Sequence, residues 1–329
     1  MTAAAGVIQA FFTDRLARQR QASPHTVAAY RDTIRMLLGF ASARTGKPPS
    51  QLDIADLDAP AVSAFLDHLG HDRGNSDRTR NARLAAIHSL FGYAALRCPE
   101  HSADIERVLA IPPRNTARTI VTYLTEPEAD ALLAAPDAAT RTGRRDHAWM
   151  LLAIQTGLRA SELTGLTCAD VHLGGGPYVA CHGKGRKDRI TPLKPATVTA
   201  VGGWMTEDGG LPHDPLFTTI RGGPMSTDAL QQRLTVYSET AVRACPSLAA
   251  KRVTPHVMRH TAAMRLLHAG NDITVIALWL GHENTATTQI YLQADMELKK
   301  RALDRTAPPG TRKGRYQPPD RLLAFLEGL

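Results

Sequence analysis

Residues 256–291 read HVMRHTAAMRLLHAGNDITVIALWLGHENTATTQIY, and this stretch holds the most informative chemistry in the chain. A histidine and an arginine lie one helical turn apart, a Leu-Gly-His turn follows, and a tyrosine comes after that turn. Together with two upstream residues they form one set: Arg159, Lys184, His256, Arg259, His282 and Tyr291. Two guanidiniums, an ammonium, two imidazoles and a phenol can hold, protonate and attack a phosphate without a metal. The set therefore predicts chemistry on a phosphodiester.

Tyr291 is the candidate nucleophile. A free phenol has a pKa near ~10, and it becomes reactive when cations and a base stabilise its phenolate. Attack on a DNA phosphorus would give a covalent phosphotyrosine and store the bond energy, so that rejoining needs no ATP. The ordinary alternative is a core or surface tyrosine on an amphipathic helix. The preceding Thr287-Thr288-Gln289-Ile290 follows the Leu-Gly-His turn, which favours the functional interpretation.

Arg159 and Arg259 are candidates for clamping the non-bridging phosphate oxygens, where they would neutralise charge as the phosphorane forms. Arg259 follows His256 by one helical turn, which places both on one helix face. His256 could serve as acid or base, and His282 could donate a hydrogen bond to the phosphate. The alternative is that the arginines are two surface residues among many, and the placement beside His256 is the stronger clue.

Lys184 lies in a basic, glycine-rich segment, GKGRKD over residues 183–188. Tyr178–His182 and Arg189–Leu193 flank it, and the pattern predicts a β-hairpin. An ammonium at the hairpin tip could swing toward the scissile bond and protonate the leaving 5′ oxygen. The alternative is a basic turn that touches backbone phosphates, and Arg186 or Lys187 could hold the lysine's role instead.

A zinc site is a rival interpretation of His256 and His260, which lie four residues apart. The residues between them are Val-Met-Arg, so the glutamate of a zinc-protease helix is missing and the arginine would repel a cation. We therefore expect neither a metal nor another cofactor.

Composition narrows the class of protein. A length of 329 residues predicts two domains, and a net charge of +8 with a pI near 9.5 favours a polyanionic partner. Four scattered cysteines without a CxxC pair argue against a disulfide frame or a zinc site. Since we find neither a membrane-spanning apolar run nor a signal-peptide profile, we expect a cytoplasmic, nucleoid-associated protein.

The N-terminal part shows helical periodicity. We expect a short amphipathic helix within residues 1–20, and a second helix that begins at the Ser23-Pro24 cap and ends near Gly46. A third is expected over Ala61–Leu69, closed by Gly70. A fourth begins at Ser76 or Asp77 and turns these residues inward: Leu84, Ile87, Leu90, Phe91 and Ala94.

Three arginines, Arg78, Arg80 and Arg83, lie in the first turns of the fourth helix. Positive charge at a helix N-terminus opposes the helix dipole, so an anion is expected to compensate it. Given the basic chain, we favour a DNA-facing surface over a merely solvated one.

Residues 99–122 contain prolines and basic residues and lose helical periodicity, which predicts an interdomain linker. We expect these domains: a helical DNA clamp over 1–110, a linker over 111–122, a catalytic domain over 123–305 and a basic tail over 306–329. Catalytic-domain helices are expected from Thr125, over Arg145–Gln155, around Ser161, and over 227–244, 255–269, 272–280 and 285–292.

These segments resemble the tyrosine recombinases, or integrases, of bacteria, phages and mobile elements. The resemblance rests on five motifs in the family's order: TGLRASEL at 156–163, GKG at 183–185, HVMRH at 256–260, LGH at 280–282 and TQIY at 288–291. SPHTVAAY at 23–30 and RTRNARL at 78–84 are similar to the family's core-binding domain. Each motif alone is weak, and their order makes the match specific.

The resemblance implies a mainly α protein, with an N-terminal helical core-binding (SAM-like) domain and an α+β catalytic domain that carries a small antiparallel sheet. It implies a clamp around duplex DNA, four identical or related protomers on two DNA sites, and strand exchange through a Holliday junction. By this resemblance Tyr291 is the nucleophile, Arg159 and Arg259 bind the phosphate, and Lys184 is the general acid. His256 and His282 complete the pocket.

Two further residues gain supporting roles from the resemblance: Glu162 near the first arginine, and His260, which we expect to buttress the site. The tail after Lys299 suggests a helix exchanged between protomers, or alternatively a basic tail with a short helix. We expect integration, excision or transposition of a mobile element. The alternatives are resolution of chromosome or plasmid dimers, a relaxing topoisomerase, and a regulator that binds DNA without cleaving it.

Overall fold

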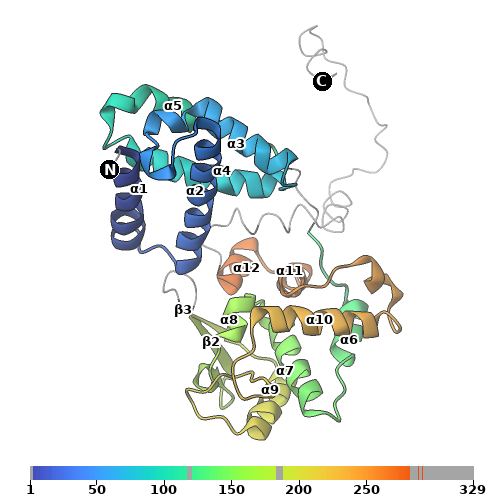
Figure 1. Cartoon of the computed structure of the whole chain (residues 1–329). Coiled ribbons are helices and arrows are strands. Elements are labelled where there is room, and N and C mark those ends of the chain that lie inside the picture. The colour runs from blue at the N-terminus through green and yellow to red at the C-terminus, as the bar shows by residue number, and fades with distance from the viewer. Residues whose placement is uncertain (1–2, 117–120, 183–187, 282–287, 289–290, 292–329) are drawn as a thin grey trace, which may run out of the picture. The chain divides into compact units, whose positions relative to one another are not determined.

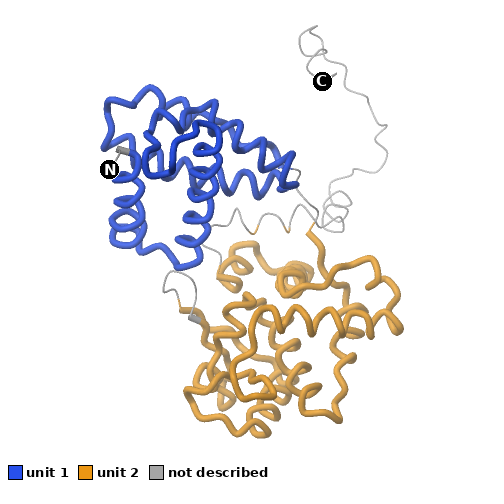
Figure 2. Tube along the Cα trace, viewed as in Figure 1, with its two compact units in different colours: residues 1–118 blue, residues 119–329 orange. Residues whose placement is uncertain are grey.

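The computed structural model describes residues 3–116, 121–182, 188–281, 288 and 291. The chain divides into two compact units, residues 1–118 and 119–329 (Figures 1 and 2). Both units are built mainly of helices, and the second adds a small antiparallel sheet, which confirms the expected fold class. Among the described residues, no helix is long and apolar enough to cross a membrane.

Unit 1 is a helical domain around one apolar core. Its helices are α1 (Ala3–Ala10), α2 (Pro24–Thr45), α3 (Ala59–His71), α4 (Asp77–Ala94) and α5 (Ser102–Leu109). A π-helix, η1 (Phe11–Gln19), continues α1, and short 3-10 turns are η2 (Pro49–Gln51), η3 (Ile54–Leu57) and η4 (Pro99–His101). The core includes Phe11, Phe65 and Phe91, all nearly inaccessible to solvent.

The predicted caps of unit 1 are largely confirmed. The Ser23 hydroxyl accepts the Thr26 N–H at 3.2 Å, and Gly46 ends α2 with a φ of +72°. Ser76 caps α4 by accepting the Thr79 N–H. All five apolar residues predicted to turn inward on α4 are buried.

Two predictions for unit 1 were wrong. Gly70 does not close α3, which continues to His71 because buried neighbours such as Phe65 and Leu69 outweigh the ~1 kcal/mol cost of a helical glycine. Residues 99–109 are not linker but η4 and α5. Ile105 and Val108, one turn apart, bury the inner face of α5 in the unit 1 core.

Unit 2 holds the sheet and the remaining helices. Its helices are α6 (Glu126–Ala134), α7 (Arg141–Thr156), α8 (Ala160–Thr164), α9 (Pro195–Asp208), α10 (Thr227–Ala241), α11 (Pro255–His268) and α12 (Ile273–Leu280), with 3-10 turns η5 (Cys168–Asp170) and η6 (Pro246–Ala250). Its strands are β1 (Val171–His172), β2 (Tyr178–His182) and β3 (Asp188–Pro192), antiparallel in the order β1-β2-β3. The β2–β3 register, in which His182 pairs with Asp188, confirms the predicted pairing of these strands.

Sequence periodicity missed α9 and β1. The α9 sequence PATVTAVGGWMTED is rich in β-branched residues and holds two glycines, all poor helix formers. Thr197, Val201 and Trp204 nevertheless fall on one buried face, and α9 packs on α7. Tertiary packing therefore overrides propensity here. The helix predicted over 285–292 lies, apart from 288 and 291, outside the described residues.

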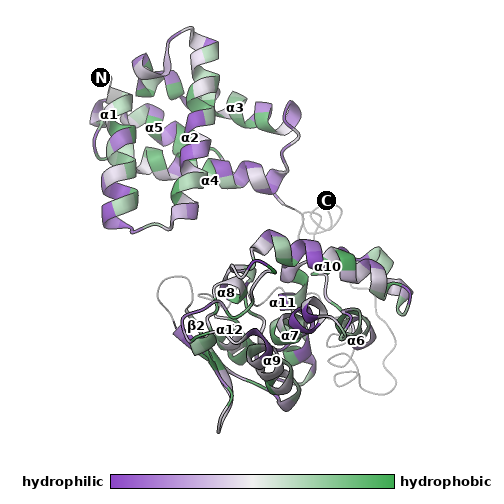
Figure 3. Ribbon diagram, turned by 60° about the horizontal axis from the view of Figure 1, so that its bottom comes forward, coloured by the Kyte–Doolittle hydropathy of each residue, from purple (hydrophilic) through white to green (hydrophobic). Residues whose placement is uncertain are grey.

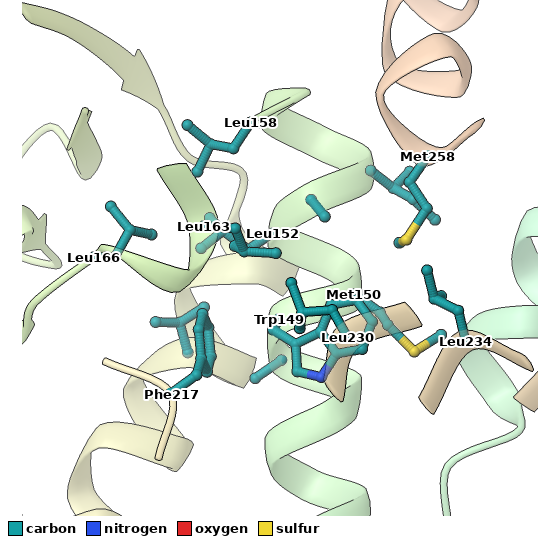
Figure 4. Packing of buried hydrophobic residues seen from close by; sticks show 14 of the residues in the cluster. Trp149, Met150, Leu152, Leu158, Leu163, Leu166, Phe217, Leu230, Leu234 and Met258 are labelled. Carbon is teal, nitrogen blue, oxygen red and sulfur yellow. The ribbon is translucent and has the colours of Figure 1, made fainter. Parts of the chain in front are cut away.

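The core of unit 2 forms around α7. Figure 4 shows Trp149, Met150 and Leu152 of this helix meeting Leu163 of α8 and Leu230 of α10. Figure 3 shows hydrophilic and hydrophobic residues mixed along the helices of both units, as expected when each helix buries only one face. Because α7 is central, the turn that follows it is held firmly in place.

Beside this core lies a buried ionic cluster, which we call the Asp146 cluster. The Asp146 carboxylate is fully buried and accepts hydrogen bonds from Arg145 at 2.8 Å, Arg233 at 2.6 Å, Trp149 at 2.9 Å and the Tyr237 hydroxyl at 2.7 Å. Its partners come from α7 and α10, so the cluster ties these two helices together. Such pairing is what allows a charge to be buried at all.

Candidate active site

The turn after α7 places the first arginine. Gly157 ends α7 in the left-handed region with a φ of +66°. A side chain there is also disfavoured because its Cβ would lie 2.5 Å from the Leu280 side chain of α12, which would have to shift. The chain then turns directly into α8, with Arg159 at its N-cap. The glycine in the TGLR motif therefore brings the α7–α8 turn against α12.

Arg259 forms the floor of the site. It is only 4% exposed, and its guanidinium donates to two backbone carbonyls, that of Gly157 at 2.6 Å and that of Leu280 at 2.7 Å. Burial, and next the charge of Arg159, lower its pKa to about 10. The guanidinium thus keeps its charge at neutral pH while no carboxylate forms a salt bridge with it among the described residues.

Arg159 is the more accessible arginine, with a side chain that is 37% exposed. It donates to the Glu162 carboxylate at 2.7 Å and to the Gly281 carbonyl at 3.1 Å. Burial raises the pKa of Glu162, but hydrogen bonds from Arg189 and from the Arg159 backbone, with the charge of Arg189, outweigh it and lower the pKa to about 2. Glu162 is therefore ionised and orients Arg159.

Arg189 is a site residue that sequence reasoning missed. From β3 it donates to both Glu162 oxygens, at 3.1 and 2.7 Å. Strand alternation in the sequence did not reveal it, because the structure turns Arg189 to the same side as the buried Thr191 and leaves the apolar Ile190 exposed. A basic residue on the inner face of a strand requires an acidic partner.

These contacts leave the site with an excess of positive charge. Three guanidiniums, those of Arg159, Arg189 and Arg259, lie near the single Glu162 carboxylate, and only the first two are hydrogen-bonded to it among the described residues. Two of them also point at the last carbonyls of α12, the negative end of that helix. An anion with two or more oxygens would complete this arrangement, as a phosphate does.

Tyr291 lies beside the arginines. It is 1% exposed and packs among Met264, Ile276 and Leu280 of α11 and α12. Burial raises its pKa to about 12, although the charges of Arg259 and Arg159 act in the opposite direction. The phenol is therefore neutral in the free protein, and the nearby cations favour the phenolate that the proposed chemistry needs.

Two histidines of α11, His256 and His260, differ in their relation to Tyr291. His260 is buried, and its Nδ1 lies 2.9 Å from the Tyr291 hydroxyl. His256 is exposed, and its ring contacts that of His260 with centroids 4.1 Å apart. Of these two histidines, His260 contacts the candidate nucleophile. The sequence had suggested only a buttressing role for it.

Four candidate residues lie outside the described part of the chain: Lys184, His282, Arg186 and Lys187. Within the described part, no group of three or more histidine, cysteine or acidic side chains is placed to hold a metal ion. The site is thus assembled from Arg159, Arg259, Glu162, His260 and Tyr291, with His256 at its edge and Arg189 behind it.

The three arginines of α4 do not form the expected outward row. Arg78 is exposed, but Arg83 donates to Thr33 and Ala29 of α2. Arg80 is 7% exposed because it shares the inward face of α4 with Leu84. The same helical spacing that turns Leu84 inward also turns Arg80 inward, so only Arg78 remains as an exposed candidate among the three.

Comparisons with known proteins point to one family. Residues 122–297 match the family model described as "Phage integrase family", and residues 8–97 match "Phage integrase, N-terminal SAM-like domain". A Sinorhizobium fredii protein named "Putative integrase/recombinase y4rC" is 51% identical over 99% of this chain and 98% of its own length. "Tyrosine recombinase XerC" of Pelobacter propionicus is 31% identical over 90% of this chain and 94% of its own.

Two solved structures show the same fold. XerH recombinase bound to a palindromic difH substrate matches with a TM-score of 0.68 and 21% identity, covering 87% of this chain and 81% of that one. The Tn1549 transposon integrase bound to a circular intermediate DNA matches with a TM-score of 0.66 and 17% identity, covering 91% and 99%. The family models and the full-length relatives establish that the chain belongs to the phage integrase family of tyrosine recombinases, which cleave and rejoin DNA.

Proposed function

We propose that this protein is a site-specific recombinase that cuts duplex DNA through a 3′-phosphotyrosine at Tyr291. One observation carries the proposal. The Tyr291 hydroxyl lies 2.9 Å from His260, in a site where three guanidiniums surround one carboxylate and two of them bind it. A nucleophile, a base and an excess of cations are what a phosphoryl transfer without a metal requires.

The first chemical step follows from the side chains. Arg159 and Arg259 bind the non-bridging oxygens of the scissile phosphate, and the Tyr291 oxygen attacks phosphorus. A bond forms between that oxygen and phosphorus, and the bond from phosphorus to the 5′ oxygen breaks. The phenolic proton passes to His260, or through it to His256, and the 5′ oxygen takes up a proton from Lys184.

The second step is the reverse with a different strand. A free 5′ hydroxyl attacks the phosphotyrosine, regenerates the phenol and rejoins the DNA. One phosphodiester is exchanged for another, so the reaction consumes no ATP. The side chains named above supply the catalysis, so it uses no metal. His282 donates a further hydrogen bond to the phosphate, and Arg78, Arg186 and Lys187 contact the DNA backbone.

The partners of this activity are two duplex DNA sites held by a tetramer of this chain, or of this chain with related recombinases. We propose that the reaction moves a mobile element by integration, excision or transposition. The relative named as an integrase/recombinase supports this role because it matches over nearly its whole length. The presence of Tyr291, Arg159 and Arg259 weighs against a regulator that binds DNA without cutting it.

A covalent trapping experiment tests the proposal. The protein is incubated with sheared DNA from its host in EDTA without ATP. Protein-linked DNA is precipitated with potassium dodecyl sulfate and sequenced to find the site. A duplex that carries this site and a nick near the cut is then labelled at either end of the cleaved strand. We expect an adduct that retains the 5′ label, as a 3′-phosphotyrosine requires.

Tyr291→Phe supplies the control. This variant should bind the same duplex and trap no DNA. Three outcomes would refute the proposal: an adduct formed by the Phe variant, an adduct that retains only the 3′ label, and cleavage that appears only when magnesium is added.

A further inference from the structure

Arg189 joins the strand that leads out of the 183–187 segment to the phosphate-binding arginines. It lies in β3 opposite Cys181 of β2, and its side chain is 11% exposed. Its two terminal nitrogens donate to the two Glu162 oxygens, one to each. This fork fixes the plane of the carboxylate, which a single-point contact cannot do.

Glu162 is fully engaged by these contacts. Its Oε1 accepts from Arg159 at 2.7 Å as well as from Arg189, and its Oε2 accepts from the Arg159 backbone N–H at 2.8 Å as well as from Arg189. Arg189 therefore takes acceptor capacity that Arg159 would otherwise use. As a result Arg159 makes one bond to the carboxylate and one to the Gly281 carbonyl.

Arg189 also lies against the end of α12. A Cβ on Gly281 would be 2.8 Å from Nη1 of Arg189, and Gly281 has a φ of +64°. This backbone leads directly to His282 in sequence. The Arg189 guanidinium thus contacts the α12 C-terminus and Glu162 at once, while its buried Nε has no hydrogen-bond partner in the described structure. Such an orphaned donor offsets part of what the two bonds to Glu162 contribute to stability.

We propose that Arg189 is a positioning residue for DNA cleavage. By holding Glu162 in a fork, it keeps the Arg159 guanidinium oriented toward the phosphate and couples the strand that follows Lys184 to the arginine pair. This inference rests on the proposed cleavage function. Without Arg189, the carboxylate would be free to draw Arg159 into a two-bond pair of its own, away from the phosphate.

Three variants test the proposal: Arg189→Met, Arg189→Lys and Glu162→Gln. Single-turnover adduct formation is measured at saturating protein, beside the dissociation constant of the non-covalent complex. We expect Arg189→Met to slow cleavage about 10- to 100-fold with a dissociation constant within about 2-fold of the wild type, because misplacement of a catalytic group affects the chemical step. The cleavage rate of Arg189→Lys should lie between those of Arg189→Met and the wild type, since an ammonium keeps the charge and loses the fork.

Arg233→Met is the matched control. Arg233 forms a similar ion pair with the buried Asp146 in the same unit, and among the described residues it forms no hydrogen bond or ion pair with the site residues. This variant should lower the melting temperature and cleave, at a temperature where it is folded, within about 2-fold of the wild-type rate. The Arg233→Met variant therefore shows what the loss of a buried ion pair does by itself, apart from the loss of the Arg189–Glu162 pair.

The double variant Arg189→Met/Glu162→Gln adds a second readout. If Arg189 acts through Glu162, the double variant should cleave no more than about 3-fold slower than Glu162→Gln alone. Multiplicative losses would overturn the proposal. So would a cleavage rate of Arg189→Met equal to that of the wild type, or a loss confined to DNA affinity. Absence of any adduct from the wild-type protein would instead refute the proposed function.

Discussion

Two buried tyrosines of unit 2, Tyr237 and Tyr291, have almost the same acidity and opposite surroundings. Each has a pKa raised to about 12, with burial as the largest cause. Part of the rise at Tyr237 comes from the Asp146 carboxylate, to which its hydroxyl donates, although Arg233 opposes this. Tyr291 instead faces Arg259 and Arg159, both of which favour its phenolate. The sign of the neighbouring charge, and not burial or pKa, distinguishes a structural phenol from a candidate nucleophile.

The carboxylates of the two regions differ in the same way. Asp146 and Glu162 are each held by two arginines. Around Asp146 the remaining acceptor capacity is filled by Trp149 and Tyr237, and the carboxylate is fully buried. Each cluster has one partly exposed arginine, Arg233 at 33% and Arg159 at 37%. The Glu162 cluster differs in having a third guanidinium beside it, that of Arg259, and this excess of positive charge is available to a ligand.

Replacing each of the two tyrosines with phenylalanine should give the largest difference in effect between the two regions. Tyr291→Phe should abolish covalent adduct, whereas Tyr237→Phe should retain cleavage within about 3-fold and lose about 1–2 kcal/mol of unfolding free energy with its buried hydrogen bond. Adduct yield on the nicked duplex and urea denaturation measure the two effects. If Tyr237→Phe were fully folded and formed no adduct, the sign of the neighbouring charge would not identify the nucleophile.

Neutralising the two carboxylates should give the next largest effect. Asp146→Asn leaves Arg145, whose side chain is 6% exposed, without a counter-charge, which costs about 3–5 kcal/mol of unfolding free energy. Glu162→Gln should cost about 1–3 kcal/mol, because Arg159 can turn to water, although Arg189, 11% exposed, loses its counter-charge. Cleavage should respond in the opposite order, with the larger loss in Glu162→Gln. All three tryptophans, Trp149, Trp204 and Trp279, lie in unit 2, so their fluorescence reports the unfolding of that unit.

An opposite order of stability loss would mean that the Glu162 cluster, and not the Asp146 cluster, holds unit 2 together. Asp272→Asn provides a surface control, since this aspartate caps α12 and lies in no buried cluster of the described residues. Its effect should stay well below ~1 kcal/mol, because asparagine caps a helix about as well as aspartate.

Lowering the pH should reduce the unfolding free energy of unit 2 gradually and by a smaller amount. Glu162 and Glu128 both have pKa values lowered to about 2; at Glu128, burial acts upward and the hydrogen bonds from Lys251 and Ser247 outweigh it. Because the folded pKa lies below the unfolded one, the stabilisation is complete above pH ~4.5 and is lost as the pH falls toward ~2. The loss should reach at most about 3 kcal/mol for each group.

Tryptophan fluorescence during urea titrations between pH 6 and pH 2 measures this loss, on the order of a few kcal/mol in total. Glu162→Gln should flatten the pH dependence by about half, since it removes one of two linked groups. The contacts indicate that Glu162 is ionised in the folded protein. If stability fell with pH as steeply in Glu162→Gln as in the wild type, that assignment would be wrong.

Much of the fold could be predicted because local signals agreed with packing. Ser23-Pro24 and Ser76 are capping residues in any context, and Gly157 ends α7 because no other residue adopts its backbone as easily. Where local and tertiary signals disagreed, prediction failed. α9 has poor helix formers throughout, and only burial of Val201 and Trp204 makes it a helix.

The site divides in the same manner. Tyr291, Arg159 and Arg259 were identified because their motifs lie in a fixed order along the chain. Arg189 was not, since a lone arginine in a strand resembles many surface arginines until its partner is known. Arg80 was misjudged because its charge suggested solvent, although its helical position set it on the face of Leu84.

The sequence by itself determined the family, the chemical class and the identity of the candidate nucleophile, because these depend on residue types and their order. Only the tertiary structure decided which groups surround that nucleophile. His260 and not His256 contacts the Tyr291 hydroxyl among these two, and Arg189 comes from β3 to hold Glu162. Electrostatic environment depends on distances between residues far apart in sequence, and spacing along one chain does not contain those distances.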